Sequence, residues 1–287
     1  MPVPTGPMRV SEMLVHTFRL MRAHPASTLG IGALLATVDA TVSGVVVNGV
    51  LARSDALRDI TTQSGSAATA EILGQLADVT RAALPWLALT FAISFLTQLA
   101  ATGVMTLAVI RARRDEPVQP STLWNDVPWL RLLAINGLII GLIVLAAAGP
   151  IAIAVFAPSF APFAVGFVVA AALVLALGTA LAVPASMSEV VPARQAVARS
   201  FALIRGAWWR TAGALLVANI IWSGIGSFIA TPIASIFGAL AGGSSSTFAQ
   251  TLQSLMTSIL AGAIALPGIA IMATLVYFDR IARTSTQ

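Results

Sequence analysis

The chain lacks cysteine altogether, and this absence excludes disulfide bonds, thiolate metal sites and cysteine nucleophiles. Lysine is also missing, so all sixteen positive charges are arginines. Charged residues make up only 9% of the 287 residues, whereas 57% are hydrophobic and the mean hydropathy is +0.91. A soluble protein of this length has more surface than so few charges could cover. The composition therefore indicates an integral membrane protein.

Residues that carry catalysis are scarce as well. The only two histidines, His16 and His24, lie near the N-terminus, and Glu12 precedes His16 at the spacing of a surface pair on a helix. No HExxH, GxSxG or phosphate-loop motif is present. We therefore expect no catalytic residue, no bound metal and no cofactor. The sequence pI of about 11.4 comes from arginines scattered beside apolar runs, so we expect no nucleic-acid partner.

Several apolar windows are long enough to cross a membrane. They lie near 27–50, 84–110, 132–157, 159–184, 211–240 and 252–278. The sequence APSFAP at 157–162 separates the third window from the fourth, because proline disfavours helix in the residue before it. We expect an all-α polytopic membrane protein that forms one integral domain over 1–287, with six transmembrane helices arranged as three hairpins.

The distribution of arginine predicts the orientation of these spans. Only Arg53, Arg58 and Arg81 lie between the first and second windows, where acidic residues dilute them. Every other arginine precedes the first window, follows the sixth, or lies between the second and third or the fourth and fifth. The positive-inside rule then places both termini in the cytoplasm, and we expect the protein in the bacterial cytoplasmic membrane. Residues 51–83 are expected to include a short amphipathic helix on the outer surface.

Each hairpin is preceded by a segment with an apolar stripe at helical spacing. These segments lie near 10–23, 120–131 and 190–209. Helices of this kind lie in the membrane interface with their apolar face toward the lipid. The sequence therefore predicts one interfacial helix followed by two spans, repeated three times.

Arginine and tryptophan gather in these interfacial segments. Tryptophan is suited to headgroup depth, and arginine can bury its stem while its guanidinium stays at the phosphates. One interpretation is anchoring alone; the other is binding of an anionic lipid headgroup. The candidate residues are Arg22, Arg131, Arg194, Arg205, Trp208 and Arg210.

Polar residues recur at every fourth position in two of the spans. The ridge of the second span is Thr90, Ser94, Gln98, Thr102 and Thr106, and that of the fifth is Asn219, Ser223, Ser227, Thr231 and Ser235. Such ridges join helices through hydrogen bonds, some of them to the carbonyl one turn earlier, or they line a polar path. A GxxxG motif at Gly137 and Gly141 is expected to pack within the chain.

Asp39 lies about midway along the first span. A carboxylate at the centre of a bilayer costs at least about 2.5 kcal/mol, and no arginine lies at that depth. We expect Asp39 to face protein, within hydrogen-bond reach of Gln98 or another polar ridge group. The candidate intramembrane polar residues are Asp39, Gln98, Asn219 and Ser223.

Two stretches carry a resemblance to a known family, RVSEMLVHTFRLMRAHPASTLGI at 9–31 and ARQAVARSFALIRGAWWRTAGALL at 193–216. Their order of amphipathic helix, arginine and span resembles the membrane domain associated with bacterial glycerophosphoryl diester phosphodiesterases, a family common in actinobacteria. Some members carry a separate cytosolic phosphodiesterase barrel, whose chemistry uses paired histidines and a carboxylate cluster around a metal. Because the chain stops shortly after its sixth window, we expect no such barrel.

These observations favour a non-catalytic multi-pass membrane protein, an accessory or scaffold component that handles envelope lipid or serves a partner complex. The alternative is a small transporter or channel with a polar path lined by the second and fifth spans, and a phosphodiesterase ranks third. The partners expected are membrane lipids, anionic ones among them, and a protein partner or a second copy of the chain.

Single-cysteine labelling can test the orientation, because the chain has no cysteine of its own. We expect Ser121→Cys and Gln287→Cys to react only from the cytoplasmic side, and Ser64→Cys and Ser245→Cys to react with an impermeant thiol reagent added to intact cells. Protection of Ser64→Cys from that reagent, with labelling only after lysis, would invert the orientation.

Overall fold

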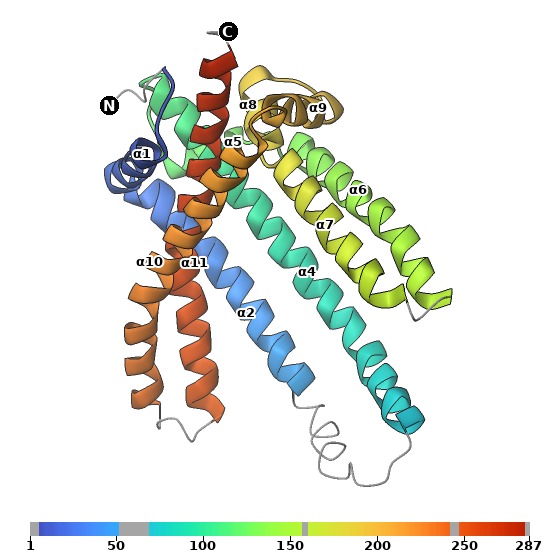
Figure 1. Cartoon of the computed structure of the whole chain (residues 1–287). Helices are drawn as coiled ribbons and strands as arrows, with labels where there is room; N and C mark the ends of the chain where they lie inside the picture. The colour runs from blue at the N-terminus through green and yellow to red at the C-terminus, as the bar shows by residue number, and fades with distance from the viewer. Residues whose placement is uncertain (1–5, 52–68, 157–159, 242–246, 285–287) are drawn as a thin grey trace. The chain divides into compact units, whose positions relative to one another are not determined.

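The computed structural model describes residues 6–51, 69–156, 160–241 and 247–284 (Figure 1). All regular secondary structure within these ranges is helical. Six of the helices are long and apolar enough to cross a membrane. A helix suits this environment because all of its backbone hydrogen bonds close within one segment. The chain is therefore an all-α, multi-pass membrane protein, as the composition predicts.

Each membrane-spanning helix overlaps one of the predicted windows. Their bounds are α2 (Ile31–Leu51), α4 (Thr69–Arg113), α6 (Trp129–Phe156), α7 (Ala161–Thr179), α10 (Trp208–Leu240) and α11 (Thr247–Thr284). The order of the three expected pairs along the chain is thus confirmed: α2 and α4, α6 and α7, α10 and α11.

Shorter helices precede or join these pairs. They are α1 (Val10–Ala23), the π-helix η1 (Ala26–Gly30), α5 (Pro120–Asp126), α8 (Ala182–Glu189) and α9 (Ala193–Ile204). Helix α1 has the bounds that the sequence predicts. Its start is stabilised by the backbone N–H of Arg9, which donates to the Glu12 carboxylate at 2.8 Å. Helix α1 buries Met13, Thr17 and Met21, which lie one turn apart on one face.

Two of the predicted interfacial helices are shorter than expected. The segment near 190–209 divides at Gly206, whose φ of +84° glycine adopts without steric cost, so α9 ends at Ile204 and α10 begins at Trp208. The segment near 120–131 divides after Asp126, because Pro128 cannot donate the backbone hydrogen bond that would continue α5. Trp208 therefore opens a membrane-spanning helix instead of closing a surface helix.

The expected short surface helix within 51–83 is wrong. Helix α4 runs without a break from Thr69 to Arg113, over 45 residues, and contains Pro85. At 1.5 Å per residue it is about 68 Å long, roughly twice the hydrocarbon thickness of a bilayer. Proline is tolerated inside such helices because neighbouring groups can satisfy the carbonyl that it leaves free. The amphipathic pattern of this segment therefore belongs to an extension of the second span.

The described residues group into two compact units. Unit 1 comprises Met1–Gly32, Leu99–Ile225 and Ile264–Gln287, and unit 2 comprises Ala33–Gln98 and Gly226–Ala263. Helices α4, α10 and α11 contribute residues to both units. The expectation of one integral domain over 1–287 stays a prediction.

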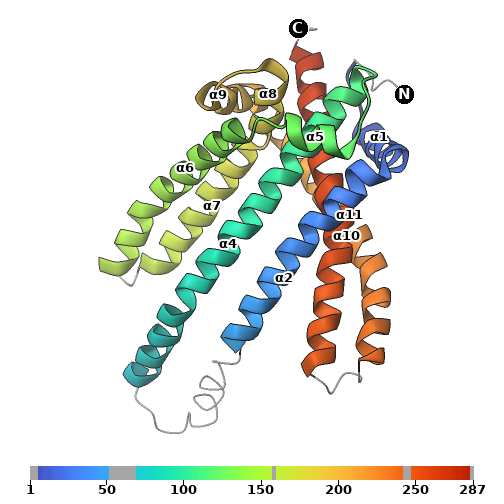
Figure 2. The same cartoon turned by 180° about the vertical axis from the view of Figure 1, so that it is seen from behind.

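Helices α6 and α7 of unit 1 lie side by side, with α8 and α9 close to one end of the pair (Figures 1 and 2). Helix α7 ends at Thr179 in a turn that the sequence does not predict. Ser200 of α9 supplies hydrogen-bond partners for two backbone groups of this turn. Its hydroxyl donates to the Gly178 carbonyl at 2.6 Å and accepts from the Leu181 N–H at 3.2 Å. A side chain at Gly178 would collide with the ring of Phe201, so glycine permits this close packing.

Glycines also decide how closely α10 and α11 approach each other. In unit 2, a Cβ atom at Gly226 would lie 2.6 Å from the Ala261 carbonyl oxygen. By contrast, Gly137 and Gly141 of α6 are exposed, and a Cβ atom at either would meet no described atom within 4 Å. The prediction that this GxxxG motif packs within the chain is therefore wrong, since its face of α6 is turned away from the other described helices.

Gly226→Ala is expected to lower the free energy of unfolding by about 1–3 kcal/mol, because the added methyl group forces the α10 and α11 backbones apart. Gly224→Ala is a matched control on the same helix, where a Cβ atom meets nothing within 4 Å and alanine favours helix. Thermal unfolding of the detergent-solubilised variants measures the difference. Equal melting temperatures for the two variants would contradict this packing.

Candidate functional site

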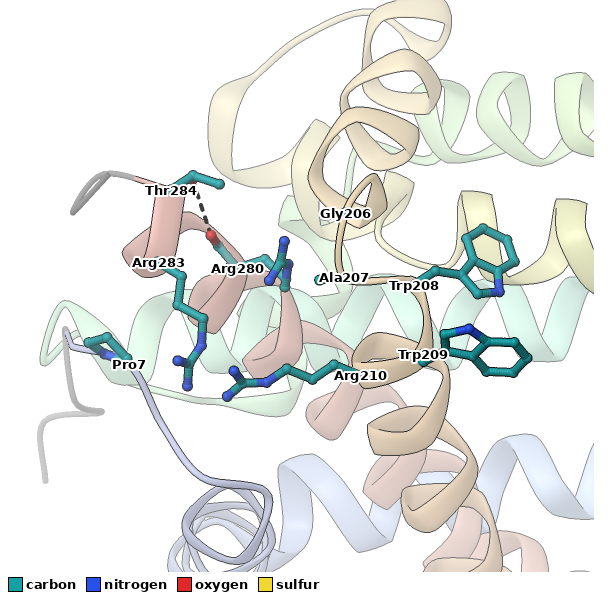
Figure 3. Close-up of a pocket in the computed structure, with 9 residues that line it drawn as sticks. All are labelled: Pro7, Gly206, Ala207, Trp208, Trp209, Arg210, Arg280, Arg283 and Thr284. Atoms are coloured by element: carbon teal, nitrogen blue, oxygen red, sulfur yellow. Dashed lines mark hydrogen bonds between the residues drawn. The ribbon is translucent and has the colours of Figure 1, made fainter.

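A cavity of about 580 Å³ lies in unit 1, where the first turn of α10 approaches the last turns of α11 (Figure 3). We call it the arginine cavity. Its lining residues are Pro7, Gly206, Ala207, Trp208, Trp209, Arg210, Arg280, Arg283 and Thr284. The lining contains three arginines and no acidic residue.

The turn at Gly206 positions the residues that α10 contributes. It redirects the chain from α9 into α10, so Trp208, Trp209 and Arg210 all lie in the first turn of α10. Figure 3 shows the Arg210 side chain extending toward Arg280 and Arg283, while both indole rings point away from them. Trp209 is 85% exposed. One helical turn thus presents a cation on one side and aromatic surface on the other.

Arg283 is fixed by a buried carboxylate. Its Nε lies 2.9 Å from each carboxylate oxygen of Asp279, and its Nη2 donates to the Met8 carbonyl at 3.0 Å. The Met8 N–H donates to the same carboxylate at 2.8 Å. Asp279 is only 3% exposed, so its charge is paired within the protein. These contacts fasten the residues before α1 to the end of α11.

The other two arginines make no ion pair with a described carboxylate. Arg280 donates from Nε to the Leu203 carbonyl at 3.0 Å, which is a neutral partner. Arg210 makes no side-chain hydrogen bond or ion pair with any described residue, although its charge repels that of Arg280. The three guanidinium groups share the single negative charge of Asp279, which also attracts Arg280. An anion with several oxygen atoms would relieve the repulsion between Arg210 and Arg280 and accept hydrogen bonds from both side chains.

The arginine cavity therefore offers hydrogen-bond donors and positive charge. Its lining includes no histidine or carboxylate that could act as a general base, and its one hydroxyl, from Thr284, donates to the Arg280 carbonyl at 3.1 Å. Among the residues that the structure describes, no group of three or more histidines and carboxylates could hold a metal ion. The chemistry that this lining supports is binding of an anion.

The structure places only two of the predicted interfacial residues, Trp208 and Arg210, in this cavity. Arg205 is the exposed residue after the end of α9, and Arg194 lies exposed in its first turn; neither lines the cavity. Arg280 and Arg283, by contrast, appear in the sequence only as charges that follow the last span. Their spacing of three residues on one helix face is the signal that could have identified them as a pair.

The remaining predicted arginines have other surroundings. Arg131 at the start of α6 donates from Nη1 to the Ser186 carbonyl of α8 at 3.3 Å and so joins these two helices. Arg22 lies exposed on α1, beside a separate groove that also involves α10.

Asp39 has the kind of partner that the sequence predicts. In unit 2, the Ser94 hydroxyl donates to the Asp39 carboxylate at 2.5 Å. Ser94 belongs to the ridge of the second span, one turn before Gln98. The expected contact between Asp39 and this ridge is confirmed, with Ser94 as the donor.

Several hydroxyl groups of the two ridges bond within their own helices. Thr90, Thr231 and Ser235 each donate to the carbonyl four residues earlier, at 3.0, 2.7 and 2.8 Å. In unit 1, the ridge residue Asn219 is exposed and Ser223 is half-buried. Hydrogen bonds to the preceding turn are the ordinary way to satisfy hydroxyl groups in a membrane helix, so they support the packing interpretation at these positions.

A further cavity, of about 400 Å³, lies beside α1 and contains several titratable groups. It is lined by His16, Arg19, Leu20, Ala23, His24, Ala112, Asp115 and Glu116. Burial lowers the pKa of His16 below its ordinary value, the charge of Arg19 lowers it further, and Glu12 opposes both effects. Because both signs of charge line this cavity, it is less suited to an anion than the arginine cavity.

No family model, curated protein or solved structure matches the chain. The resemblance to the membrane domain associated with glycerophosphoryl diester phosphodiesterases stays a prediction.

Asp39→Asn should leave the melting temperature close to that of the wild type, because the amide oxygen can accept the same hydrogen bond from Ser94. Ser94→Ala should cost about 1–3 kcal/mol, since it removes the donor and leaves the carboxylate in place. Thermal unfolding in detergent provides the comparison. If Asp39→Asn instead abolished a transport activity of the reconstituted protein while its fold remained, Asp39 would be a proton or solute site.

Proposed function

We propose that the protein is a non-catalytic, multi-pass protein of the bacterial cytoplasmic membrane, with both termini in the cytoplasm. Its arginine cavity holds the phosphate headgroup of an anionic lipid, and the protein serves as an accessory or scaffold component in the handling of envelope lipid. The observation that carries this proposal is Arg210, a guanidinium group that faces two other arginines and has no partner of opposite charge.

Electrostatics favours an anion at this position. Arg210, Arg280 and Arg283 share one carboxylate, so the cavity has an excess of positive charge. A basic residue near an anionic membrane surface contributes on the order of 1 kcal/mol of attraction. A phosphate group also accepts several hydrogen bonds at once and suits the planar donors of a guanidinium group.

The aromatic residues favour a lipid over a soluble phosphate. Trp208 and Trp209 flank the arginines, and Trp209 exposes 85% of its surface. Indole rings are enriched where headgroups meet acyl chains, because their apolar body and polar N–H suit that boundary. A cavity for a soluble phosphate would gain nothing from an exposed tryptophan beside it.

The transporter alternative receives less support. A polar path requires side chains whose polar atoms face the path, whereas Thr90, Thr231 and Ser235 bond to carbonyls of their own helices. Asp39 is likewise engaged by Ser94. Because these polar groups bond to other groups of the protein, they favour a packed helical bundle over a polar path.

Arg210→Gln provides a clean test, because Arg210 supports no other described residue and its loss should leave the fold intact. We expect this variant to retain phosphatidylglycerol about fivefold less tightly in native mass spectrometry, the factor that corresponds to about 1 kcal/mol. Its melting temperature in lipid-free detergent should not change.

Arg205→Gln is the matched control, since it removes the same charge only five residues away but outside the arginine cavity. Equal loss of lipid in the two variants would mean that positive charge attracts lipid in general and that the arginine cavity has no specific role. Displacement of the bound species by millimolar inorganic phosphate as readily as by phosphatidylglycerol would identify the ligand as free phosphate.

A further inference from the structure

A groove of about 440 Å³ lies between α1 and α10 in unit 1. We call it the α1–α10 groove. Its lining residues are Leu14, Val15, Phe18, Arg19, Arg22, Ile221, Trp222 and Ile225. It shares no lining residue with the arginine cavity, so it is a separate site.

The wall of this groove is apolar and uncovered. Phe18 is 58% exposed, Val15 is 46% exposed and Ile225 is 38% exposed. In a membrane, side chains of this kind gain van der Waals contacts when an apolar chain fills the groove beside them. In a membrane protein, the acyl chain of a lipid is an apolar group of the right shape for a groove beside a helix.

The positive charges of the groove both come from α1. Arg19 and Arg22 lie three residues apart, on one side of the helix. Both are exposed, and neither side chain makes a hydrogen bond or ion pair with a described residue. No acidic residue lines the groove. This arrangement favours a phosphate group of net negative charge over a zwitterionic headgroup, whose ammonium group would lack a partner.

An independent observation indicates that an acceptor is missing. Trp222 is 2% exposed, and its indole Nε1 is buried with no hydrogen-bond partner. An unpaired buried donor is rare in folded proteins because it loses its hydrogen bonds to water without replacement. The ring packs over Gly268 of α11, where any side chain would collide with it.

We propose that the α1–α10 groove binds one anionic glycerophospholipid. Arg19 and Arg22 bind its phosphate, and its glycerol-ester region lies beside Trp222, whose indole N–H donates to an ester oxygen once a small shift of the side chain exposes it. One acyl chain packs against Val15, Phe18 and Ile225. The lipid therefore supplies negative charge for the two arginines, an acceptor for Trp222 and apolar contact along the wall. This site does not depend on the arginine cavity.

The test is titration of the delipidated full-length protein with phosphatidylglycerol, followed by native mass spectrometry. We expect Arg19→Gln combined with Arg22→Gln to weaken binding at this site at least tenfold, given two lost phosphate contacts. Arg194→Gln combined with Arg205→Gln removes the same number of charges outside both sites and should have little effect.

Trp222→Phe tests the acceptor contact without removing charge. This variant should bind phosphatidylglycerol severalfold more weakly, yet be at least as stable as the wild type without lipid, because it removes the unpaired donor and keeps an aromatic ring. A role in packing alone would lower the stability without lipid and leave the lipid affinity unchanged, and that result would overturn the assignment of Trp222.

Lipid stoichiometry separates this proposal from that of the arginine cavity. We expect two bound lipids in the wild type, weaker retention of one of them in Arg210→Gln, weaker retention of the other in the Arg19 and Arg22 double variant, and weaker retention of both when the variants are combined. Loss of lipid only in Arg210→Gln would overturn the groove, whereas loss only in the double variant would overturn the arginine cavity.

Three further ligands identify which part of the lipid is recognised. Phosphatidylcholine should bind the groove at least tenfold more weakly, and glycerophosphoglycerol, which has no acyl chain, should not compete. Equal binding of phosphatidylcholine, or competition by glycerophosphoglycerol or inorganic phosphate, would overturn the proposal. So would a dimer of the chain that disappears in the double variant, because the groove would then be occupied by protein.

Discussion

The buried carboxylate of Asp279 is the contact on which the arginine cavity and the start of α1 depend. It accepts the Met8 N–H and pairs with Arg283, which in turn donates to the Met8 carbonyl. Removing one partner of a buried ion pair typically costs about 3–5 kcal/mol, because the other charge is left without compensation. This contact fixes Arg283 in the wall of the arginine cavity. It also fixes the segment that leads into α1, the helix that forms one wall of the α1–α10 groove.

Many of the arginines lie in the short helices or near the ends of the long ones. Helices α1 and α9 carry arginines on exposed faces and bury small or apolar residues, and Arg131, Arg210 and Arg283 lie in the first or last turn of a long helix. Some of these arginines form contacts within unit 1. Arg131 joins α6 to α8, and Arg199 pairs with Glu189. The Glu189 carboxylate also accepts a hydrogen bond from the hydroxyl of the buried Tyr277. Arg19, Arg22 and Arg210 make no such hydrogen bond or ion pair with a described residue. Their guanidinium groups can therefore bind a ligand.

Several polar groups of the long helices are paired between helices, and small residues allow two of these helices to pack closely. Ser94 and Asp39 satisfy one another, and the Thr106 and Thr274 hydroxyls lie 3.1 Å apart in the interior of unit 1. Gly226 lets α10 approach the backbone of α11, because a helix without a Cβ atom at that position presents a flat surface. The exposed Gly137 and Gly141 show that the same residue type does not by itself mark a contact.

The sequence by itself determined the class of protein, the number of membrane helices and their approximate positions. These follow from local physics, since a long apolar run must form a helix in lipid whatever surrounds it. The bounds of α1, the expectation that Asp39 meets a polar ridge residue, and the choice of Trp208 and Arg210 as candidate interfacial residues also follow from patterns along the chain.

Only the tertiary structure decided which distant residues share a site. Arg210, Arg280 and Arg283 line one cavity, and Arg22 and Trp222 line one groove, because helices far apart in sequence lie next to each other. No local pattern encodes that adjacency. Helix ends depended on single residues such as Gly206, whose φ of +84° ends α9 before the tryptophan pair. Long-range contacts depend on how complete helices pack, and the shape of every side chain between them contributes to that packing.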